Sequence, residues 1–206
     1  MDIKFSKNRI EFKKELNNLD KFVIDFVSVL DKLNIKYVLI SGYVSILFGR
    51  SRSSEDIDIF VEKISFEKFK GLWKELSPKF ECIITEDQEE AYKEYLMTGH
   101  AIRFSYKKQY IPNMEVKFAK SEFELISFQQ KIEVILNGIV LYVSPLELQI
   151  AVKLRLGSQK DIEDAVHLYE LFKKYLNIEE LQYYNKKLGV ESLFNKHLEN
   201  EKITRY

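Results

Sequence analysis

The stretch that decides the fold reads Ile40-Ser-Gly-Tyr-Val-Ser-Ile-Leu-Phe-Gly-Arg-Ser-Arg-Ser-Ser-Glu-Asp-Ile-Asp-Ile-Phe-Val61. An apolar run leads into Ser41-Gly42, a short helical pattern follows, and a second apolar run carries Asp56 and Asp58. Successive side chains of a strand alternate between its two faces, so two aspartates separated by one residue point the same way. Two carboxylates beside a turn that opens a helix suit a divalent metal ion and a phosphate, which indicates phosphoryl or nucleotidyl transfer.

The same aspartates also fit a strand that turns a row of acids to solvent. An acidic pair alone is a weak motif, so the interpretation depends on its context. Arg52 and Ser54 stand between the Ser41-Gly42 turn and the aspartates, and all of them fall between two strand-like segments. This order favours a binding site over a wet strand face.

Together these residues resemble the opening motif of the polymerase-β-like nucleotidyltransferases, in which a Gly-Gly or Gly-Ser pair opens a helix and Asp-x-Asp lies on the next strand. They are most similar to the AbiEii-like toxin and minimal nucleotidyltransferase branch of that superfamily. The matching positions are Ser41, Gly42, Gly49, Arg52, Ser54, Asp56 and Asp58. Ser41 replaces the usual first glycine, Ser54 replaces the usual threonine, and the bulky Tyr43 follows Gly42.

A third carboxylate is expected because two-metal transfer chemistry needs more than one acidic pair. The resemblance implies that this acid comes from a neighbouring strand, and the matching residue is Glu115 in Met114-Glu-Val-Lys-Phe118. The alternation of this segment places Glu115 opposite the apolar, core-facing positions. Glu115 also fits the wet face of an antiparallel strand, and its extra methylene makes it longer than the usual aspartate.

A second motif lies in Ile150-Ala-Val-Lys-Leu-Arg-Leu-Gly-Ser-Gln-Lys-Asp-Ile-Glu-Asp-Ala-Val-His167. It resembles the AbiEii-like pattern Lys-Leu followed by Arg/Lys-Asp-x-x-Asp. The matching positions are Lys153, Leu154, Lys160, Asp161 and Asp164. The resemblance implies that Lys153 and Lys160, with Arg52, neutralise a triphosphate, and that Asp161 and Asp164 bind a sugar hydroxyl or position the acceptor. Capping of a helix N-terminus explains Asp161 equally well.

Composition sets the remaining limits. The chain has 206 residues, of which 46% are hydrophobic, so it can bury a sizeable core. Lysine plus arginine and aspartate plus glutamate both number 32, so any contact with nucleic acid must come from a local patch. The single cysteine, Cys82, cannot form an intrachain disulfide, and no apolar stretch is long enough to cross a membrane. We therefore expect a cytoplasmic protein with no membrane partner.

Hydrophobic periodicity predicts an α/β (α+β) protein in two parts. Residues 1–143 form a nucleotidyltransferase-like domain that begins with a helix over residues 7–33, and residues 144–206 form a helical C-terminal domain. Within the first part we predict a helix over residues 44–48 and another over 66–76, with a hairpin over 131–143. The remaining predicted strands cover 37–40, 57–61, 80–84, 101–106 and 114–118, and the C-terminal helices cover 145–156, 160–174, 178–187 and 190–198. The resemblance implies that the sheet is twisted, mixed and backed by helices.

The resemblance implies an enzyme that moves an NMP from an NTP to a hydroxyl of an RNA (tRNA), a protein or a small molecule, by two-metal catalysis with Mg²⁺ or Mn²⁺. The metal ligands would be Asp56, Asp58 and Glu115. The remaining implied site residues are Asp164, which would orient the acceptor, and Ser41, Gly42, Arg52, Ser54, Lys153, Lys160 and Asp161, which would bind the nucleotide. A role as the toxin of a toxin–antitoxin pair would add an antitoxin protein as partner, and the sequence is compatible with an oligomer.

Two other classes of function fit the sequence. In the first, the chain is a catalytically retired nucleotidyltransferase-fold module that binds a nucleotide or a protein partner, and Ser41, Tyr43 and Glu115 are the departures that leave this open. In the second, it is a purely structural α/β interaction protein, which explains neither motif.

Overall fold

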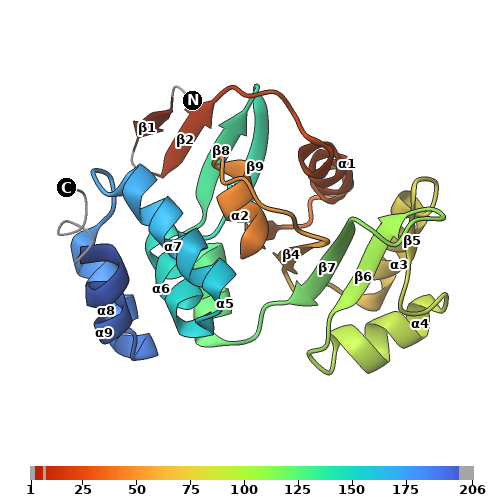
Figure 1. Ribbon diagram of the computed structural model, residues 1–206. Coiled ribbons are helices and arrows are strands. Elements are labelled where there is room, and N and C mark those ends of the chain that lie inside the picture. Colours follow the sequence, from red (N-terminus) through yellow and green to blue (C-terminus); the bar gives the residue numbers. More distant parts are fainter. Residues whose placement is uncertain (1–2, 7, 200–206) are drawn as a thin grey trace.

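A nine-stranded mixed sheet organises the computed structural model, which describes residues 3–6 and 8–199 (Figure 1). The strand order is β1-β2-β8-β9-β3-β4-β7-β6-β5. The strands are β1 (Lys4–Ser6), β2 (Arg9–Phe12), β3 (Tyr37–Ile40), β4 (Asp56–Val61), β5 (Phe80–Cys82), β6 (Ile102–Tyr106), β7 (Asn113–Phe118), β8 (Ile132–Leu136) and β9 (Ile139–Val143). At the centre, β4 pairs antiparallel with β3 and parallel with β7.

Helices cover the sheet and extend beyond one end of it. They are α1 (Asn18–Lys32), α2 (Gly42–Leu47), α3 (Phe66–Leu76), α4 (Gln88–Glu90), α5 (Glu122–Gln129), α6 (Leu146–Leu156), α7 (Gln159–Phe172), α8 (Ile178–Leu188) and α9 (Glu191–Phe194), with the wider π-type turns η1 (Ala91–Leu96) and η2 (Asn195–Glu199). Figure 1 shows α6 to α9 gathered on one side of the molecule, while α3 and α4 lie beside β5 and β6 on the other. None of the described helices is long and apolar enough to span a membrane.

The alternation of β4 determines which side chains reach the site. Ile57, Ile59 and Val61 are buried in the core, and the residues between them are only partly buried. Because the period of a strand is two, burying the three apolar residues turns Asp56 and Asp58 to the opposite face. The core therefore fixes the direction of both aspartates.

Most of the predicted elements are confirmed. The helix predicted over residues 66–76 matches α3, and the predicted hairpin matches β8 and β9. The hairpin turn places Asn137 at φ 53° and Gly138 at φ 87°, as a primed two-residue turn requires. The C-terminal helices begin near residue 145, as predicted. One buried cluster contains residues of both the sheet and these helices, so the division at residue 143 stays a prediction.

The predicted helix over residues 7–33 is wrong in its first part; of that span, Lys7 lies outside the described residues. Arg9–Phe12 forms strand β2, which pairs in parallel with β8, and α1 begins only at Asn18. Ile10 and Phe12 are both buried on one face of β2. A strand whose partner lies more than a hundred residues along the chain leaves little local signal, so the helical period of α1 by itself predicts a helix that is too long.

Candidate active site

The turn between β3 and α2 has an unusual backbone. Ser41 has φ 61° and ψ −135°, a conformation that glycine adopts readily and serine rarely does. Its carbonyl oxygen accepts a hydrogen bond of 2.8 Å from Gln149 Nε2, and Gln149 is held in turn by Ser144 Oγ, which donates to Gln149 Oε1. The first residues of the C-terminal segment therefore hold this strained turn in place.

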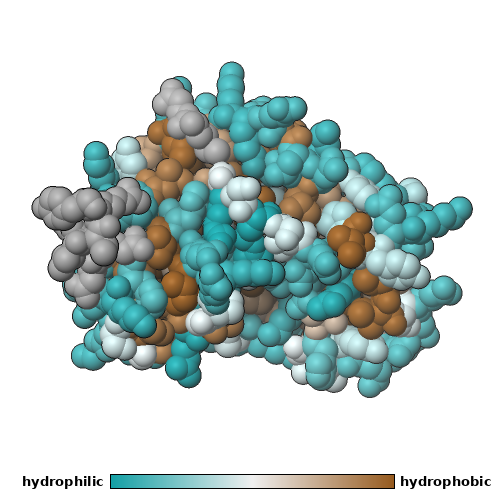
Figure 2. Space-filling model, viewed as in Figure 1, coloured by the Kyte–Doolittle hydropathy of each residue, from teal (hydrophilic) through white to brown (hydrophobic). Residues whose placement is uncertain are grey.

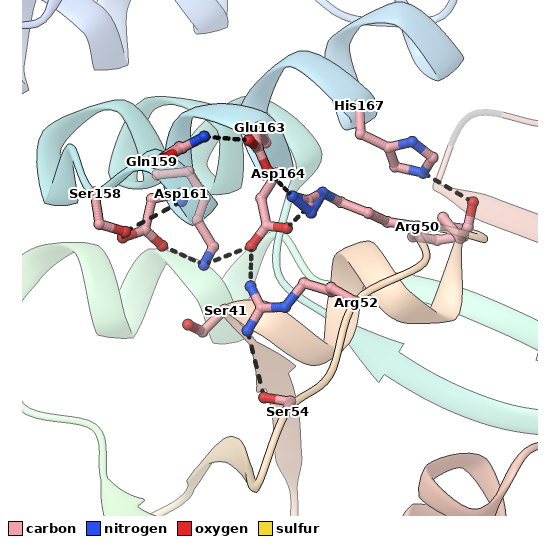
Figure 3. Close-up of polar contacts among 12 residues, drawn as sticks. Ser41, Arg50, Arg52, Ser54, Ser158, Gln159, Asp161, Glu163, Asp164 and His167 are labelled. Carbon is pink, nitrogen blue, oxygen red and sulfur yellow. Dashed lines mark hydrogen bonds and ion pairs between the residues drawn. The ribbon is translucent and has the colours of Figure 1, made fainter.

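Gly42 follows the turn, and Arg52 lies directly against it. A Cβ atom at position 42 would lie 2.7 Å from Arg52 Nη2, so the absence of a side chain permits the close approach of the guanidinium. Arg52 Nη2 also donates to Ser54 Oγ at 3.4 Å, and Ser54 Oγ donates to the carbonyl oxygen of Asp56 at 2.9 Å. Arg52 and Ser54, which Figure 3 shows, thus form one contact group with Gly42 between α2 and the start of β4.

The predicted acids lie on the same face of two neighbouring strands. Asp58 on β4 is in register with Glu115 on β7, and Asp56 precedes Asp58 by two residues. The pKa of Asp58 is raised to about 6, mainly by burial and also by the negative charges of Glu115 and Asp56. Hydrogen bonding from Ser41 and the positive charge of Lys153 act in the opposite direction. The three carboxylates are therefore near enough to repel one another.

Glu115 is bound by Arg103 of β6. Arg103 Nε and Nη2 both donate to Glu115 Oε2, at 3.0 Å and 2.6 Å. Arg103 and Glu115 also face each other in the register of β6 and β7. The third acid of the predicted site is thus already paired with a cation.

The chemistry of the donor set fits Mg²⁺ or Mn²⁺ at the two aspartates, because both ions prefer carboxylate oxygens and Asp56 and Asp58 share one face of β4. The fit is incomplete for the third ligand. Among the described residues, no three His, Cys, Asp or Glu side chains are arranged to hold a metal ion together. Asp56 and Asp58 supply two carboxylates on one strand face, whereas Glu115 is held by Arg103.

A second polar cluster links the loop before β4 to α6 and α7 (Figure 3). The Lys153 side chain is only 2% exposed and forms ion pairs with Asp161 at 2.7 Å and with Asp164 at 3.0 Å. Asp164 is fully buried and also accepts from Arg52 Nη1 at 2.5 Å and lies 3.2 Å from Arg50 Nε. Arg50 also pairs with Glu163. Three cations and three carboxylates therefore neutralise one another in this cluster.

Asp161 lies in the first turn of α7, but the residue that caps this helix is Ser158 and not Asp161 itself. Ser158 Oγ caps α7 by accepting from the backbone N–H of Asp161, and it donates to the Asp161 carboxylate at 2.6 Å. Burial opposes ionisation of Asp161, but the hydrogen bonds from Lys153 and Ser158 outweigh it and hold the pKa of Asp161 below its ordinary value. Asp161 therefore belongs to the first turn of α7 and is also a partner of the buried lysine.

The structure brings most of the predicted site residues together in two adjoining groups. One group contains Ser41, Asp56, Asp58 and Glu115, and the other contains Gly42, Arg52, Ser54, Lys153, Asp161 and Asp164. Lys160 stands apart, because it is exposed and forms no ion pair within residues 3–6 and 8–199.

Sequence reasoning missed the contributions of Arg50 and Gln149. Arg50 stands two residues before Arg52, and this spacing was an available signal for a second cation. Nothing in the sequence marks Gln149 as the residue that holds the Ser41 carbonyl, because its contact crosses more than a hundred residues. Strongly hydrophilic residues gather in the middle of the face drawn in Figure 2, over α2 and α7, where the second cluster lies.

A pocket of about 290 Å³ opens beside the acids. Its polar lining residues are Ser41, Asp58, Glu124, Ser127, Ser144, Gln149 and Lys153. The apolar lining comes from the sheet, α5 and α6, and consists of Ile40, Phe60, Phe123, Leu148, Val152 and Leu156. A second cavity of about 370 Å³ lies between the N-terminal strands and α8, and none of the predicted site residues line it.

Comparisons with known proteins place this geometry among similar folds. No protein-family model matches the chain, and no curated protein matches it significantly. A nucleotidyltransferase-like antigenic protein from Paracoccidioides brasiliensis is similar in structure, with a TM-score of 0.55 and 18% identity over 89% of this chain and 94% of that one. The antibiotic-resistance factor ANT(2'')-Ia is similar with a TM-score of 0.55 and 12% identity, over 86% of this chain and 94% of that one.

At these identities the likeness concerns the fold alone. The mixed sheet, the Asp56/Asp58 pair on β4 and the helices after β9 agree with the architecture expected from the sequence motifs. The chain has a mixed α/β fold of the nucleotidyltransferase-like type.

Proposed function

We propose that the protein is a metal-dependent nucleotidyltransferase, which moves an NMP from an NTP to a hydroxyl group. The observation that carries this proposal is the placement of Asp56 and Asp58 on one strand face, beside a strained Ser41 turn and a guanidinium seated on Gly42. A carboxylate pair next to closely spaced cations suits an NTP complexed with a divalent metal ion. The likeness in fold to the nucleotidyltransferase-like protein from Paracoccidioides brasiliensis supports the same class of chemistry.

The residues divide the task between two sides of the site. Asp56 and Asp58, joined by Glu115, would hold Mg²⁺ or Mn²⁺, and such an ion would supply positive charge that offsets the negative charge of the phosphate oxygens. Arg52 lies against the Ser41-Gly42 turn where the phosphates enter, and Lys153 faces the same pocket. The acceptor hydroxyl oxygen attacks the α-phosphorus, pyrophosphate leaves, and the hydroxyl proton passes to a carboxylate of the site.

We assign the nucleoside to the pocket beside Asp58. Its volume of about 290 Å³ lies just below the usual range for small-molecule sites. Phe60 and Phe123 supply apolar surface for a base, and we assign the phosphates to Ser41 and Lys153, which line the same pocket. Lys160 is solvent-exposed, so we assign the triphosphate contacts to Arg52 and Lys153 first and give Lys160 an outer position.

The finer assignment is to the AbiEii-like toxin branch, and it rests on the second sequence motif. Lys153, Asp161 and Asp164 occupy the matching positions and contact one another. In this proposal the acceptor is a tRNA, Asp164 helps to orient it through the cations it binds, and an antitoxin protein is the regulating partner.

A second candidate function is a catalytically retired module that binds a nucleotide or protein without turnover. The observation that favours it is the Arg103–Glu115 pair, which occupies the third carboxylate. A retired module binds NTP in a way that does not depend on a divalent metal.

Calorimetry separates these functions. Each of the four NTPs is titrated into wild-type protein with and without Mg²⁺, beside Asp58→Asn and the matched control Glu55→Gln, which removes an exposed carboxylate next to Asp56. Metal-dependent binding that is lost in Asp58→Asn and retained in Glu55→Gln supports the transferase and identifies the donor base. Binding that is the same with and without Mg²⁺, or the same in wild type and Asp58→Asn, contradicts it and favours the retired module.

A further inference from the structure

Three residues form a row across neighbouring strands on the face that carries the acids. Asp58 of β4 is in register with Glu115 of β7, and Glu115 is in register with Arg103 of β6. Residues directly opposite each other on paired strands have side chains close enough to interact. Glu115 can therefore turn to Asp58 on one side or to Arg103 on the other.

In the structure Glu115 is bound on the Arg103 side. Arg103 Nε and Nη2 both donate to the same oxygen, Glu115 Oε2. The Arg103 side chain has no other hydrogen-bond partner among the described residues. The charges of Asp56 and Asp58 also favour the protonated guanidinium, after the dominant effect of Glu115 on the pKa of Arg103. Arg103 is thus a cation that is bound to Glu115 and is also stabilised, more weakly, by the charges of Asp56 and Asp58.

We propose that Arg103 is a built-in counter-cation of the carboxylate group, which a divalent metal ion must displace to gain Glu115 as its third ligand. This inference rests on the function proposed above, because it requires Asp56 and Asp58 to bind a metal. In the metal-free protein, Arg103 neutralises Glu115 and holds it away from the aspartates. When a metal binds, Glu115 turns to Asp58 and Arg103 is released toward solvent.

The exposure of the pair makes this exchange feasible. The Arg103 side chain is 43% exposed and that of Glu115 is 27% exposed. Ion pairs with this degree of exposure are weak, because water solvates both charges after they separate. A divalent ion between three carboxylates has a stronger electrostatic attraction to them than a single guanidinium has to Glu115, so the metal ion displaces Arg103. The competition lowers the apparent affinity of the protein for the metal ion.

The test is Mn²⁺ binding to the full chain without nucleotide, followed by the electron paramagnetic resonance signal of the free ion. Arg103→Gln removes the competing charge and frees Glu115, so we expect Mn²⁺ to bind about threefold to tenfold more tightly than to wild type. Lys117→Gln is the matched control, because it removes one positive charge two residues from Glu115 on the same strand, where Lys117 pairs with Glu124. The control is expected to bind Mn²⁺ as wild type does.

A second variant keeps the test decisive if Arg103→Gln does not fold. Arg103→Lys retains the charge but lacks the two-donor fork, so its Mn²⁺ affinity should lie between those of wild type and Arg103→Gln. Circular dichroism melting curves establish that each variant is folded.

Mn²⁺ affinity that is unchanged or weaker in folded Arg103→Gln overturns the counter-cation role, since a residue that only positions Glu115 for the metal would weaken binding when removed. Asp58→Asn separates this result from failure of the proposed function. If wild type binds Mn²⁺ and Asp58→Asn does not, the metal site stands and only the role of Arg103 is lost. If neither wild type nor Arg103→Gln binds Mn²⁺, both proposals fail.

Discussion

Ser41 shows how a single residue can keep a costly backbone conformation at a site. A non-glycine residue in such a region costs on the order of 1–3 kcal/mol unless its surroundings impose it. The Gln149 side chain supplies one such restraint, by donating to the Ser41 carbonyl. This conformation places the serine hydroxyl where it limits the rise in the pKa of Asp58.

Ser41→Gly should therefore make the fold more stable. Glycine removes the strain but increases the freedom of the unfolded chain, so we expect a net gain of about 1 kcal/mol in the free energy of unfolding, measured with urea. The pKa of Asp58 should rise further, because the hydroxyl is gone. Ser53→Gly in the exposed loop is the control and should not stabilise, since Ser53 has no positive φ to relieve. A loss of stability in Ser41→Gly would contradict the strain.

The raised pKa of Asp58 predicts how stability depends on pH. The carboxyl titrates at about 6 in the folded protein, whereas an aspartate in an unfolded chain titrates at about 4. The folded state binds the proton more tightly, so the contribution of Asp58 to stability is largest below pH 4 and is lost as the pH rises through 6. Asp58→Asn removes this dependence.

We therefore expect the free energy of unfolding of Asp58→Asn, minus that of wild type, to increase by on the order of 2 kcal/mol between pH 4 and pH 7. Urea titrations at several pH values measure it. A difference that stays constant with pH would mean that the Asp58 carboxyl titrates normally.

At the scale of elements, the sequence predicted those whose signal is local. The period of α3 and the turn between β8 and β9 each lie within a short window, and the structure has both. The start of α7 was predicted near the right place, but its cap is Ser158 and not Asp161. The two motifs likewise predicted residues that the fold brings together, because each fixes several side chains on one strand or one helix.

The elements that were missed had weak or distant signals. Strand β2 depends on pairing with β8, which no local window contains. Helix α5 has its apolar residues spread around the axis, but Ser121 and Glu124 form a capping box that could have identified its start. The Arg103–Glu115 pair could not be predicted because it depends on the order and register of β6 and β7.

Alanine substitutions at two helical glycines, Gly71 in α3 and Gly42 in α2, should give different results. Gly71 lies inside α3, where an added Cβ atom would meet nothing within 4 Å, so Gly71→Ala should raise the free energy of unfolding by about 0.5–1 kcal/mol through helix propensity. Gly42→Ala would instead push Arg52 away from the start of α2. The guanidinium is the end of a flexible side chain, so stability should change by less than about 1 kcal/mol.

The Gly42→Ala variant should show its effect in NTP affinity, which we expect to fall about tenfold in calorimetry because one charged phosphate contact is displaced. Gly71→Ala is the control and should bind NTP as wild type does. Equal NTP affinity in both variants would mean that Arg52 makes no contact with the nucleotide.

At the scale of the whole molecule, Asp164 connects the two parts of the chain. It lies on α7 and pairs with Arg50 and Arg52 from the loop before β4, as well as with Lys153 of α6. Removing one partner of a buried ion pair costs more than the pair itself contributes, because it leaves an unpaired charge.

Asp164→Ala should lower the free energy of unfolding by about 3–5 kcal/mol, measured by urea or thermal unfolding. Glu163→Gln is the control on the same helix, since the Glu163 side chain that pairs with Arg50 is half exposed, and it should change stability little. A similar loss of stability in both variants would contradict a special role for the buried carboxylate.

The alternation of side chains along β4 has a consequence for how this chain can vary in length. Asp56 and Asp58 share a strand with Ile57 and Ile59, and the two sets face opposite ways. Inserting or deleting one residue inside β4 would exchange the sets, placing carboxylates in the core and isoleucines in the site. Relatives of this protein should therefore differ in length in the loop between β6 and β7, and keep the same number of residues from the first aspartate to the end of β4.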